Sequence, residues 1–118
     1  MTIRHANAIK LAMSTLCDVS FFEHILAIYL FGSCARGEES FSSDVDIMVE
    51  VNISYVDMSK EERHDFLMLV SELNVSSDTR AAIDLKLVED NVWNNSNSLF
   101  YSRVRRDSIC LWDSRKVI

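Results

Sequence analysis

The chain of 118 residues contains no proline and only two glycines. Average glycine usage of about 7% would place roughly eight glycines in a chain of this length. Both glycines, Gly32 and Gly37, lie within residues 30–37, which read LFGSCARG. Because the sequence avoids glycine elsewhere, its presence here indicates a segment where a side chain would obstruct the backbone or the approach of a ligand.

Basic residues and cysteines are also scarce, and each shortage restricts the function. The 12 lysines and arginines are outnumbered by 18 aspartates and glutamates, which gives a formal net charge of −6. Binding to nucleic acid through its phosphates requires Lys and Arg, so we expect no direct nucleic-acid binding. The three cysteines, Cys17, Cys34 and Cys110, are widely spaced and odd in number, which is typical of the reducing cytoplasm rather than of a disulfide-bonded scaffold.

The sequence also lacks linker-like segments and long apolar runs. No stretch approaches the roughly 20 apolar residues that are needed to cross a bilayer. A length of 118 residues with 48% hydrophobic content suits one compact core. We therefore expect a single cytoplasmic domain over residues 1–118, with no association with a membrane.

Hydrophobic periodicity predicts alternating helices and strands. Ser59 and Glu62 have the spacing of a capping box, which satisfies free backbone N–H groups at a helix start. Residues 94–98 favour turns and caps, so they are expected to separate two short helices. The longer helices are expected at residues 5–17 and 59–74, the last short helix at 98–106, and the strands at 24–31, 44–51, 80–88 and 109–112.

The strand that ends at Gly32 leads into a turn that suits an anion. Free backbone N–H groups at such a turn supply positive potential, and missing side chains let phosphate oxygens approach closely. The hydroxyl of Ser33 adds a donor. The structural alternative is that Ser33 only caps a short helix and Gly37 only makes a turn, and the Gly-Ser pair alone does not decide between these explanations.

Asp44 and Asp46 are the first candidate metal ligands. Residues two apart on a strand point the same way and lie roughly 6–7 Å apart along the chain. Like charges held close together raise one another's pKa, whereas Mg²⁺ binds carboxylate oxygens and relieves the repulsion. The alternative is an exposed edge strand with two solvated aspartates.

Asp84 lies within an otherwise apolar predicted strand, where a buried charge needs a partner. Its partner is either Lys86, on the same strand face, or the metal site at Asp44 and Asp46. We favour the metal site because its other two elements are present.

These residues together resemble a known family. Gly32-Ser33, ten intervening residues, Asp44-Val45-Asp46 and a later apolar strand with an aspartate are the pattern of the nucleotidyltransferase superfamily of DNA polymerase beta. The strings GSCARG and SDVDI look most like the minimal nucleotidyltransferases and are similar to the catalytic half of kanamycin nucleotidyltransferase. The likeness covers nearly the whole chain and implies an α/β (α+β) fold, with a small mixed β-sheet and helices packed mainly on one face.

The resemblance also implies a reaction and the residues that perform it. A nucleoside monophosphate, expected to be AMP from ATP, would pass to a hydroxyl acceptor with release of pyrophosphate and the help of two Mg²⁺ ions. The resemblance assigns the β and γ phosphates to Gly32 and Ser33, and metal binding with catalysis to Asp44, Asp46 and Asp84. Arg36 and Gly37 lie next to this turn and are further candidates for nucleotide binding, although an exposed arginine on a turn is usually only solvated.

Small size suggests how such a domain is used. Larger superfamily members add a second, mostly helical part, and members of this size resemble antitoxins that modify a tyrosine of a HEPN-type RNase toxin with AMP. We therefore expect a homo- or hetero-oligomer with such a toxin as partner. The alternatives are a non-catalytic antitoxin that acts by binding, and an enzyme that modifies a small molecule such as an aminoglycoside. The complete set of three carboxylates favours an active enzyme.

Other polar and aromatic residues have simpler explanations. Arg103 and Arg106 share a helix face, but cations near a helix C-terminus stabilise it without any ligand. The three histidines show no metal-binding spacing in the sequence. Trp93 and Trp112 are expected to pack in the core or at an interface.

Overall fold

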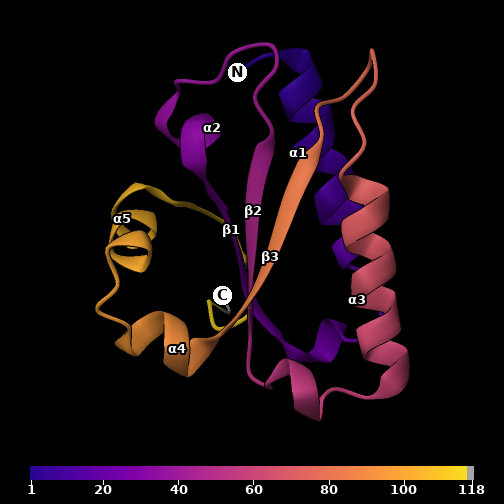
Figure 1. Cartoon of the computed structure of the whole chain (residues 1–118), viewed down its shortest axis with the longest axis vertical. Helices are drawn as coiled ribbons and strands as arrows, with labels where there is room; N and C mark the ends of the chain where they lie inside the picture. Colours follow the sequence, from indigo (N-terminus) through magenta and orange to yellow (C-terminus); the bar gives the residue numbers. More distant parts are fainter. Residues whose placement is uncertain (117–118) are drawn as a thin grey trace.

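The computed structural model describes residues 1–116, apart from the side chains of Asn91 and Asn94. Four strands form one mixed sheet in the order β3-β2-β1-β4 (Figure 1). The strands are β1 (Ile25–Phe31), β2 (Val45–Val51), β3 (Ile83–Glu89) and β4 (Ile109–Asp113). The helices are α1 (Ile3–Leu16), α2 (Gly32–Arg36), α3 (Lys60–Leu73), α4 (Asp90–Asn95) and α5 (Leu99–Asp107), with short 3₁₀ helices η1 (Phe22–His24) and η2 (Tyr55–Asp57). Within residues 1–116, no helix combines the length and apolar character needed to cross a membrane.

The strand directions bring three chain segments together at one end of the strands, and this end is called the site edge of the sheet. β1 pairs antiparallel with β2, and β2 pairs parallel with β3. The carboxyl end of β1, which continues into α2, therefore lies at the same edge as the first residues of β2 and β3. This edge is at the top of Figure 1.

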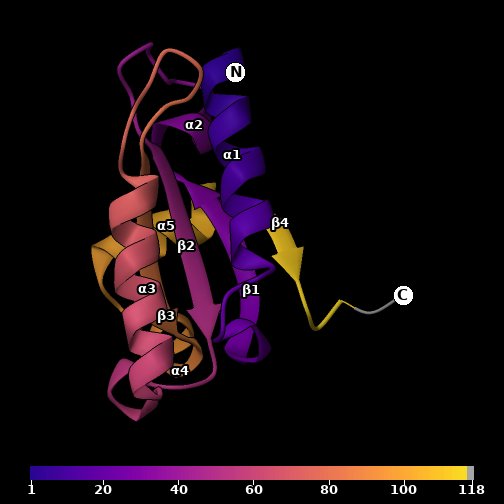
Figure 2. The same ribbon diagram turned by 90° about the vertical axis from the view of Figure 1, so that its right-hand side faces the viewer.

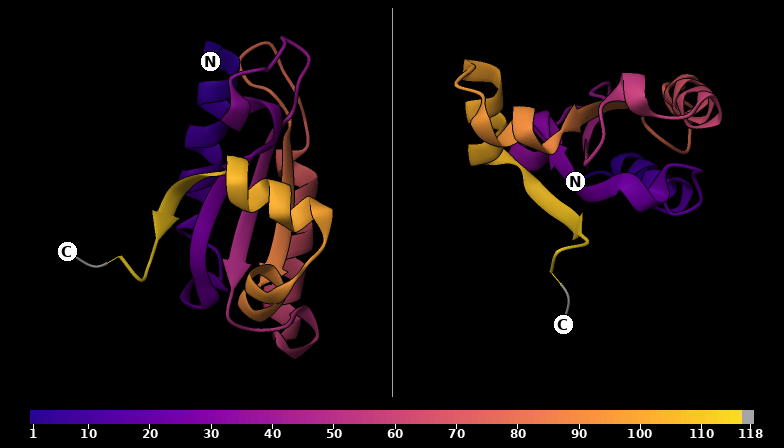
Figure 3. Two further views of the ribbon diagram at one scale, coloured as in Figure 1. Left: turned by 90° about the vertical axis from the view of Figure 1, so that its left-hand side faces the viewer. Right: turned by 90° about the horizontal axis from the view of Figure 1, so that it is seen from below.

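The two longest helices, α1 and α3, cover one face of the sheet (Figure 3). Side chains of a strand alternate between its two faces, so every second residue of β2 points toward these helices. The predicted capping box begins α3, because the Ser59 and Glu62 side chains each accept a hydrogen bond from the other's backbone N–H. The residues of β2 that enter this core are Val45, Ile47, Val49 and Val51.

The shorter α4 and α5 lie on the opposite face (Figure 3). Trp93 of α4 and Val104 of α5 pack there in a second buried cluster with Phe31, Met48 and Val88. β4 pairs with β1 as the outer strand of the sheet and turns away from the other strands (Figure 2). The mixed sheet with its longest helices on one face confirms the expected fold class.

The elements lie within two residues of their predicted bounds, except for the start of the third strand. This strand begins at Ile83 rather than at residue 80. Arg80 instead turns back to the end of α3, where its guanidinium donates to the carbonyls of Leu73 at 3.1 Å and Glu72 at 3.2 Å. Arg80 therefore secures the end of α3 before the chain enters the sheet.

Candidate functional site

Gly32 follows β1 directly, and its backbone has a φ of +73°, which residues with side chains rarely adopt. A Cβ placed at this position would lie 2.1 Å from Oδ2 of Asp46. The backbone conformation therefore favours glycine, and the Asp46 carboxylate occupies the space that a side chain would enter. The scarcity of glycine correctly indicated an obstructed position, and the obstructing group is a carboxylate of the protein itself.

Gly37 has a similar backbone conformation but different surroundings. Its φ is +70°, and no atom lies within 4 Å of a Cβ placed there. Its N–H donates to the carbonyl of Cys34 at 3.3 Å and closes the last turn of α2, which is a capping role. A contribution of Gly37 to nucleotide binding remains a prediction.

Asp46 and Asp84 are register partners on the parallel strands β2 and β3. Residues paired in this way share a face of the sheet. Since Val45 and Ile47 point toward α1 and α3, the two aspartates point toward the side of α4 and α5. Asp44, two residues before Asp46, is exposed, and its charge acts on Asp46. The three predicted aspartates therefore gather around Asp46, at the edge where Gly32 lies.

The concentration of negative charge affects Asp46 most. Burial, followed by the charges of Asp84 and Asp44, raises the pKa of Asp46 to about 6. In the structure, no choice of one oxygen from each of the three aspartates places all three within 4.8 Å of one another. Carboxylate oxygens are ligands that suit Mg²⁺, which also retains waters and phosphate oxygens. With bonds of about 2.0–2.1 Å, one Mg²⁺ holds its ligand oxygens no more than about 4.2 Å apart, so these side chains would have to move to bind one ion together.

Asp84 is less buried than the sequence suggested. Its side chain is 47% exposed, and Nζ of Lys86 lies 4.0 Å from its Oδ2. The premise of a charge buried in an apolar strand is wrong, because Ile83 and Leu85 face the core while the side with Asp84 is open. An exposed ion pair at this separation contributes little to the stability of the fold. It does not explain why Asp84 lies in register with Asp46.

The start of α1 holds the segment that leads into Asp44. His5 is fully buried, and its Nε2 lies 2.8 Å from the carbonyl oxygen of Ser43. Arg4 donates to the carbonyl of Phe41 at 2.8 Å, and its guanidinium lies 4.3 Å from the centre of the Phe41 ring. The first helix was predicted only to cover the sheet, but it also positions one of the candidate ligands.

Cys34 is buried next to the segment that leads into Asp44, and its thiol is unreactive at neutral pH. Burial, with further contributions from the charges of Glu39 and Asp46, raises the pKa of its thiol to about 11. Its Sγ lies 3.8 Å from the carbonyl oxygen of Asp44. Because only the thiolate is a strong nucleophile, Cys34 serves packing rather than reaction.

A hollow of about 500 Å³ opens beside Gly32, where α2 and α5 contact each other. Arg106 in its wall is held by Asp107 at 2.8 and 3.0 Å, and Arg36 pairs with Glu38 at 3.2 Å. Its lining residues are Phe31, Gly32, Arg36, Phe100, Arg103, Val104, Arg106 and Asp107.

Arg103 differs from the other arginines of the hollow. Within residues 1–116 its guanidinium makes no hydrogen bond or ion pair, although its charge acts on Asp107. Arginine binds phosphate groups strongly, and an exposed aromatic ring such as Phe100 can stack on a planar base. Arg103 and Arg106 were expected only to stabilise the end of a helix. Their three-residue spacing was the signal that both point into this hollow.

Comparison with family models shows the family to which the chain belongs. The model described as "Polymerase beta, Nucleotidyltransferase" matches residues 19–116. The chain therefore belongs to the polymerase beta nucleotidyltransferase family. No curated protein has a sequence that matches this chain significantly.

Two solved structures are similar to this chain over most of its length. A protein from Sulfolobus solfataricus, described as a candidate nucleotidyltransferase, is 22% identical, with 94% of this chain and 85% of that chain covered and a TM-score of 0.58. A toxin-antitoxin structure with AMP-PNP is 23% identical, with 92% of this chain and 75% of that chain covered and a TM-score of 0.57. These likenesses show the fold, and they confirm the fold that the sequence predicted.

Proposed function

We propose that this chain is a Mg²⁺-dependent enzyme that transfers AMP from ATP to a hydroxyl group, with release of pyrophosphate. The observation that carries the proposal is the register pairing of Asp46 and Asp84, with Gly32 pressed against the Asp46 carboxylate. Mg²⁺ held by Asp44, Asp46 and Asp84 would stabilise the charge that develops on the phosphate oxygens.

The residues of the chain supply position and charge rather than covalent chemistry. Ser33, in the first turn of α2, and Arg36 are suited to the triphosphate, and Arg103 faces the same hollow from α5. Phe100 offers a partly exposed ring to the base. Asp84, half exposed beside Asp46, is placed to accept the proton of the acceptor hydroxyl.

We further propose that the acceptor is a tyrosine of a HEPN-type RNase toxin, so that the chain acts as an antitoxin. The toxin-antitoxin structure with AMP-PNP, which shares this fold, supports a protein partner. The openness of the acidic edge supports it as well, because Asp44 is exposed and Asp84 is half exposed. A hydroxyl on the surface of another protein could reach both residues.

The test is to incubate the chain with labelled ATP, Mg²⁺ and a HEPN-type partner. We expect label on the partner and loss of its RNase activity. Asp44→Asn and Asp46→Asn should abolish labelling, and EDTA should do the same. Asp18→Asn removes the same charge from an exposed position outside the site and should behave as the wild type.

Other outcomes would contradict separate parts of the proposal. Silencing of the partner by Asp44→Asn and Asp46→Asn without label transfer would indicate an antitoxin that acts by binding. Label on an aminoglycoside, with none on protein, would contradict the acceptor but not the reaction. Absence of label on every acceptor would contradict the enzyme itself.

A further inference from the structure

A second cluster of ligand-type side chains lies at the opposite end of the sheet from the aspartates. Glu23 and His24 belong to η1, directly before β1, and Glu62 lies in the first turn of α3. The seven residues of β1 span roughly 20 Å at about 3.3 Å each, and Gly32 lies beyond their far end. The cluster is therefore separate from the candidate active site, and its role does not depend on the proposed function.

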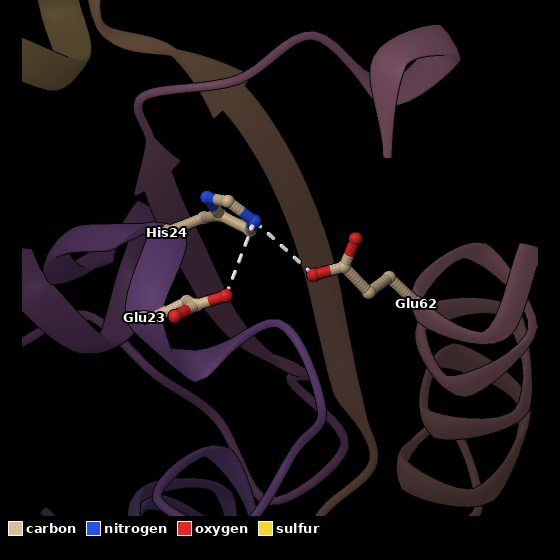
Figure 4. Close-up of side chains that lie close together, drawn as sticks. All are labelled: Glu23, His24 and Glu62. Atoms are coloured by element: carbon tan, nitrogen blue, oxygen red, sulfur yellow. Dashed lines mark ion pairs between the residues drawn. The ribbon is translucent and has the colours of Figure 1, made fainter. Parts of the chain in front are cut away.

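The three side chains converge from two elements of the fold (Figure 4). Nε2 of His24 lies 3.1 Å from Oε2 of Glu62 and 3.9 Å from Oε1 of Glu23. One ligand atom from each residue lies within 4.8 Å of the other two. A four-coordinate ion with bonds of about 2.0–2.2 Å holds its ligand atoms roughly 3.4 Å apart. Small side-chain movements would therefore complete three positions of such a site.

Groups outside the cluster orient two of its members. Nδ1 of His24 donates to Oδ1 of Asn52, just beyond β2, at 3.3 Å. In the neutral ring this bond leaves the lone pair of Nε2 directed at the carboxylates, which is how histidine ligands are usually held. Glu62 accepts from the N–H of Ser59 through Oε1 at 2.8 Å, so Oε2 remains for His24.

The charge and exposure of the cluster suit an ion. Glu23 and Glu62 supply the negative charge that a dication needs, and Glu62 is held in place by the hydrogen bond from the N–H of Ser59. The side chains of Glu62 and His24 are 13% and 24% exposed, whereas Glu23 is 80% exposed. The side next to Glu23 is therefore open, which leaves a position for water.

We propose that Glu23, His24 and Glu62 bind a transition-metal dication, best matched by Zn²⁺, that ties the start of β1 to α3. Imidazole nitrogen suits Zn²⁺ and related ions, whereas the all-oxygen set at Asp44, Asp46 and Asp84 suits Mg²⁺. The two ends of the sheet would thus select different metals. The competing explanation is a protonated His24 that pairs with both carboxylates and needs no metal.

The test is a calorimetric titration of the full chain with ZnCl₂, in excess Mg²⁺ and with the exposed Cys17 and Cys110 replaced by serine. We expect one Zn²⁺ per chain and a higher thermal unfolding temperature when it binds. Binding should weaken at least about tenfold in His24→Gln and Glu62→Gln.

Two further variants separate a metal ligand from a folding effect. His64→Gln removes an exposed histidine of the same helix, α3, and should leave Zn²⁺ affinity unchanged. Glu23→Gln changes a side chain that is 80% exposed, so the fold should remain intact while Zn²⁺ affinity falls several-fold.

Two results would overturn the proposal. The first is Zn²⁺ binding that is undiminished in both His24→Gln and Glu23→Gln, because the ion would then sit elsewhere. The second is no binding to the wild-type cluster at about 0.1 mM Zn²⁺. The cluster would then be an ion pair of a protonated histidine.

Discussion

The two glycines share a backbone conformation but differ in their surroundings, so alanine should affect them differently. The strained φ costs about 1–2 kcal/mol at either position. At Gly32 the new Cβ also meets the Asp46 carboxylate, which raises the expected loss of unfolding free energy to roughly 2–5 kcal/mol. Chemical denaturation of Gly32→Ala and Gly37→Ala measures both losses. Equal losses would show that the contact with Asp46 is unimportant.

The raised pKa of Asp46 predicts a pH dependence in the metal-free protein. Because the folded-state pKa is about 6 and the unfolded value is 3.8, Asp46 favours folding below about pH 4, and this contribution is lost as the pH rises through 6. Asp46→Asn does not titrate, so in EDTA it should become more stable than the wild type by about 1–2 kcal/mol at pH 7. Urea unfolding at pH 4 to 7 tests this difference.

Added Mg²⁺ provides the control for this prediction. A cation at the aspartates favours the charged form, so it should stabilise the wild type at pH 7 more than Asp46→Asn. If the difference in unfolding free energy between the wild type and Asp46→Asn stays constant from pH 4 to 7, the raised pKa of Asp46 is contradicted.

Some residues of the candidate site could be predicted from the sequence, because local spacing carries the signal. Gly32 follows a buried strand, and Asp44 and Asp46 alternate along the next one. The role of His5 could not be predicted, because it depends on how α1 docks against the segment before Asp44. The spacing of Arg103 and Arg106 places both on one helix face, but the hollow that they line depends on how α5 docks beside Gly32.

Among the elements, α5 is expected to contribute binding energy through Arg103. Since its guanidinium is not used by hydrogen bonds or ion pairs within residues 1–116, Arg103→Ala should raise the KM for ATP about tenfold, about 1.4 kcal/mol, with a smaller effect on kcat. Steady-state kinetics of AMP transfer provide the measurement.

Arg105 is the matched control on the same helix. Its guanidinium donates to the carbonyls of Trp93 and Ser96 at 2.6 and 3.1 Å, so it serves the fold. Arg105→Ala should lower stability while leaving the KM for ATP unchanged. An unchanged KM in Arg103→Ala would remove α5 from the nucleotide site.

The positions of the elements along the chain were predictable because helices and strands depend on near neighbours. The apolar run before Gly32 gave β1, and the capping box at Ser59 gave the start of α3. The late start of β3 was not predictable, because it follows from Arg80 bonding to the end of α3. The docking of α4 and α5 on the opposite face likewise depends on contacts between distant residues.

In the whole molecule, an ion pair between a buried glutamate and an arginine that is 45% exposed ties the carboxyl-terminal segment to the centre of the sheet. Glu50 of β2 is fully buried, and Arg115 donates to its two oxygens at 3.2 and 3.0 Å. The hydroxyl of Tyr29 donates to the same carboxylate at 3.2 Å. The segment that follows β4 is thus fastened across β1 to β2.

Removing the ion pair between Arg115 and Glu50 should lower the free energy of unfolding of the whole chain. Arg115→Ala leaves the Glu50 carboxylate with only the Tyr29 hydroxyl among the donors seen in residues 1–116, so we expect a loss of about 1–3 kcal/mol. The exposed neighbouring Lys116→Ala should change stability by less than about 0.5 kcal/mol. Thermal unfolding distinguishes the two, and similar values would mean that the buried carboxylate is stable without the arginine.

The contact between Gly32 and Asp46 also restricts how the gene can diverge. Asparagine is the residue that most readily replaces glycine in a left-handed backbone, but the acid at position 46 fills the room that it would need. Asparagine at position 32 should therefore be tolerated better when residue 46 carries a shorter side chain, such as alanine.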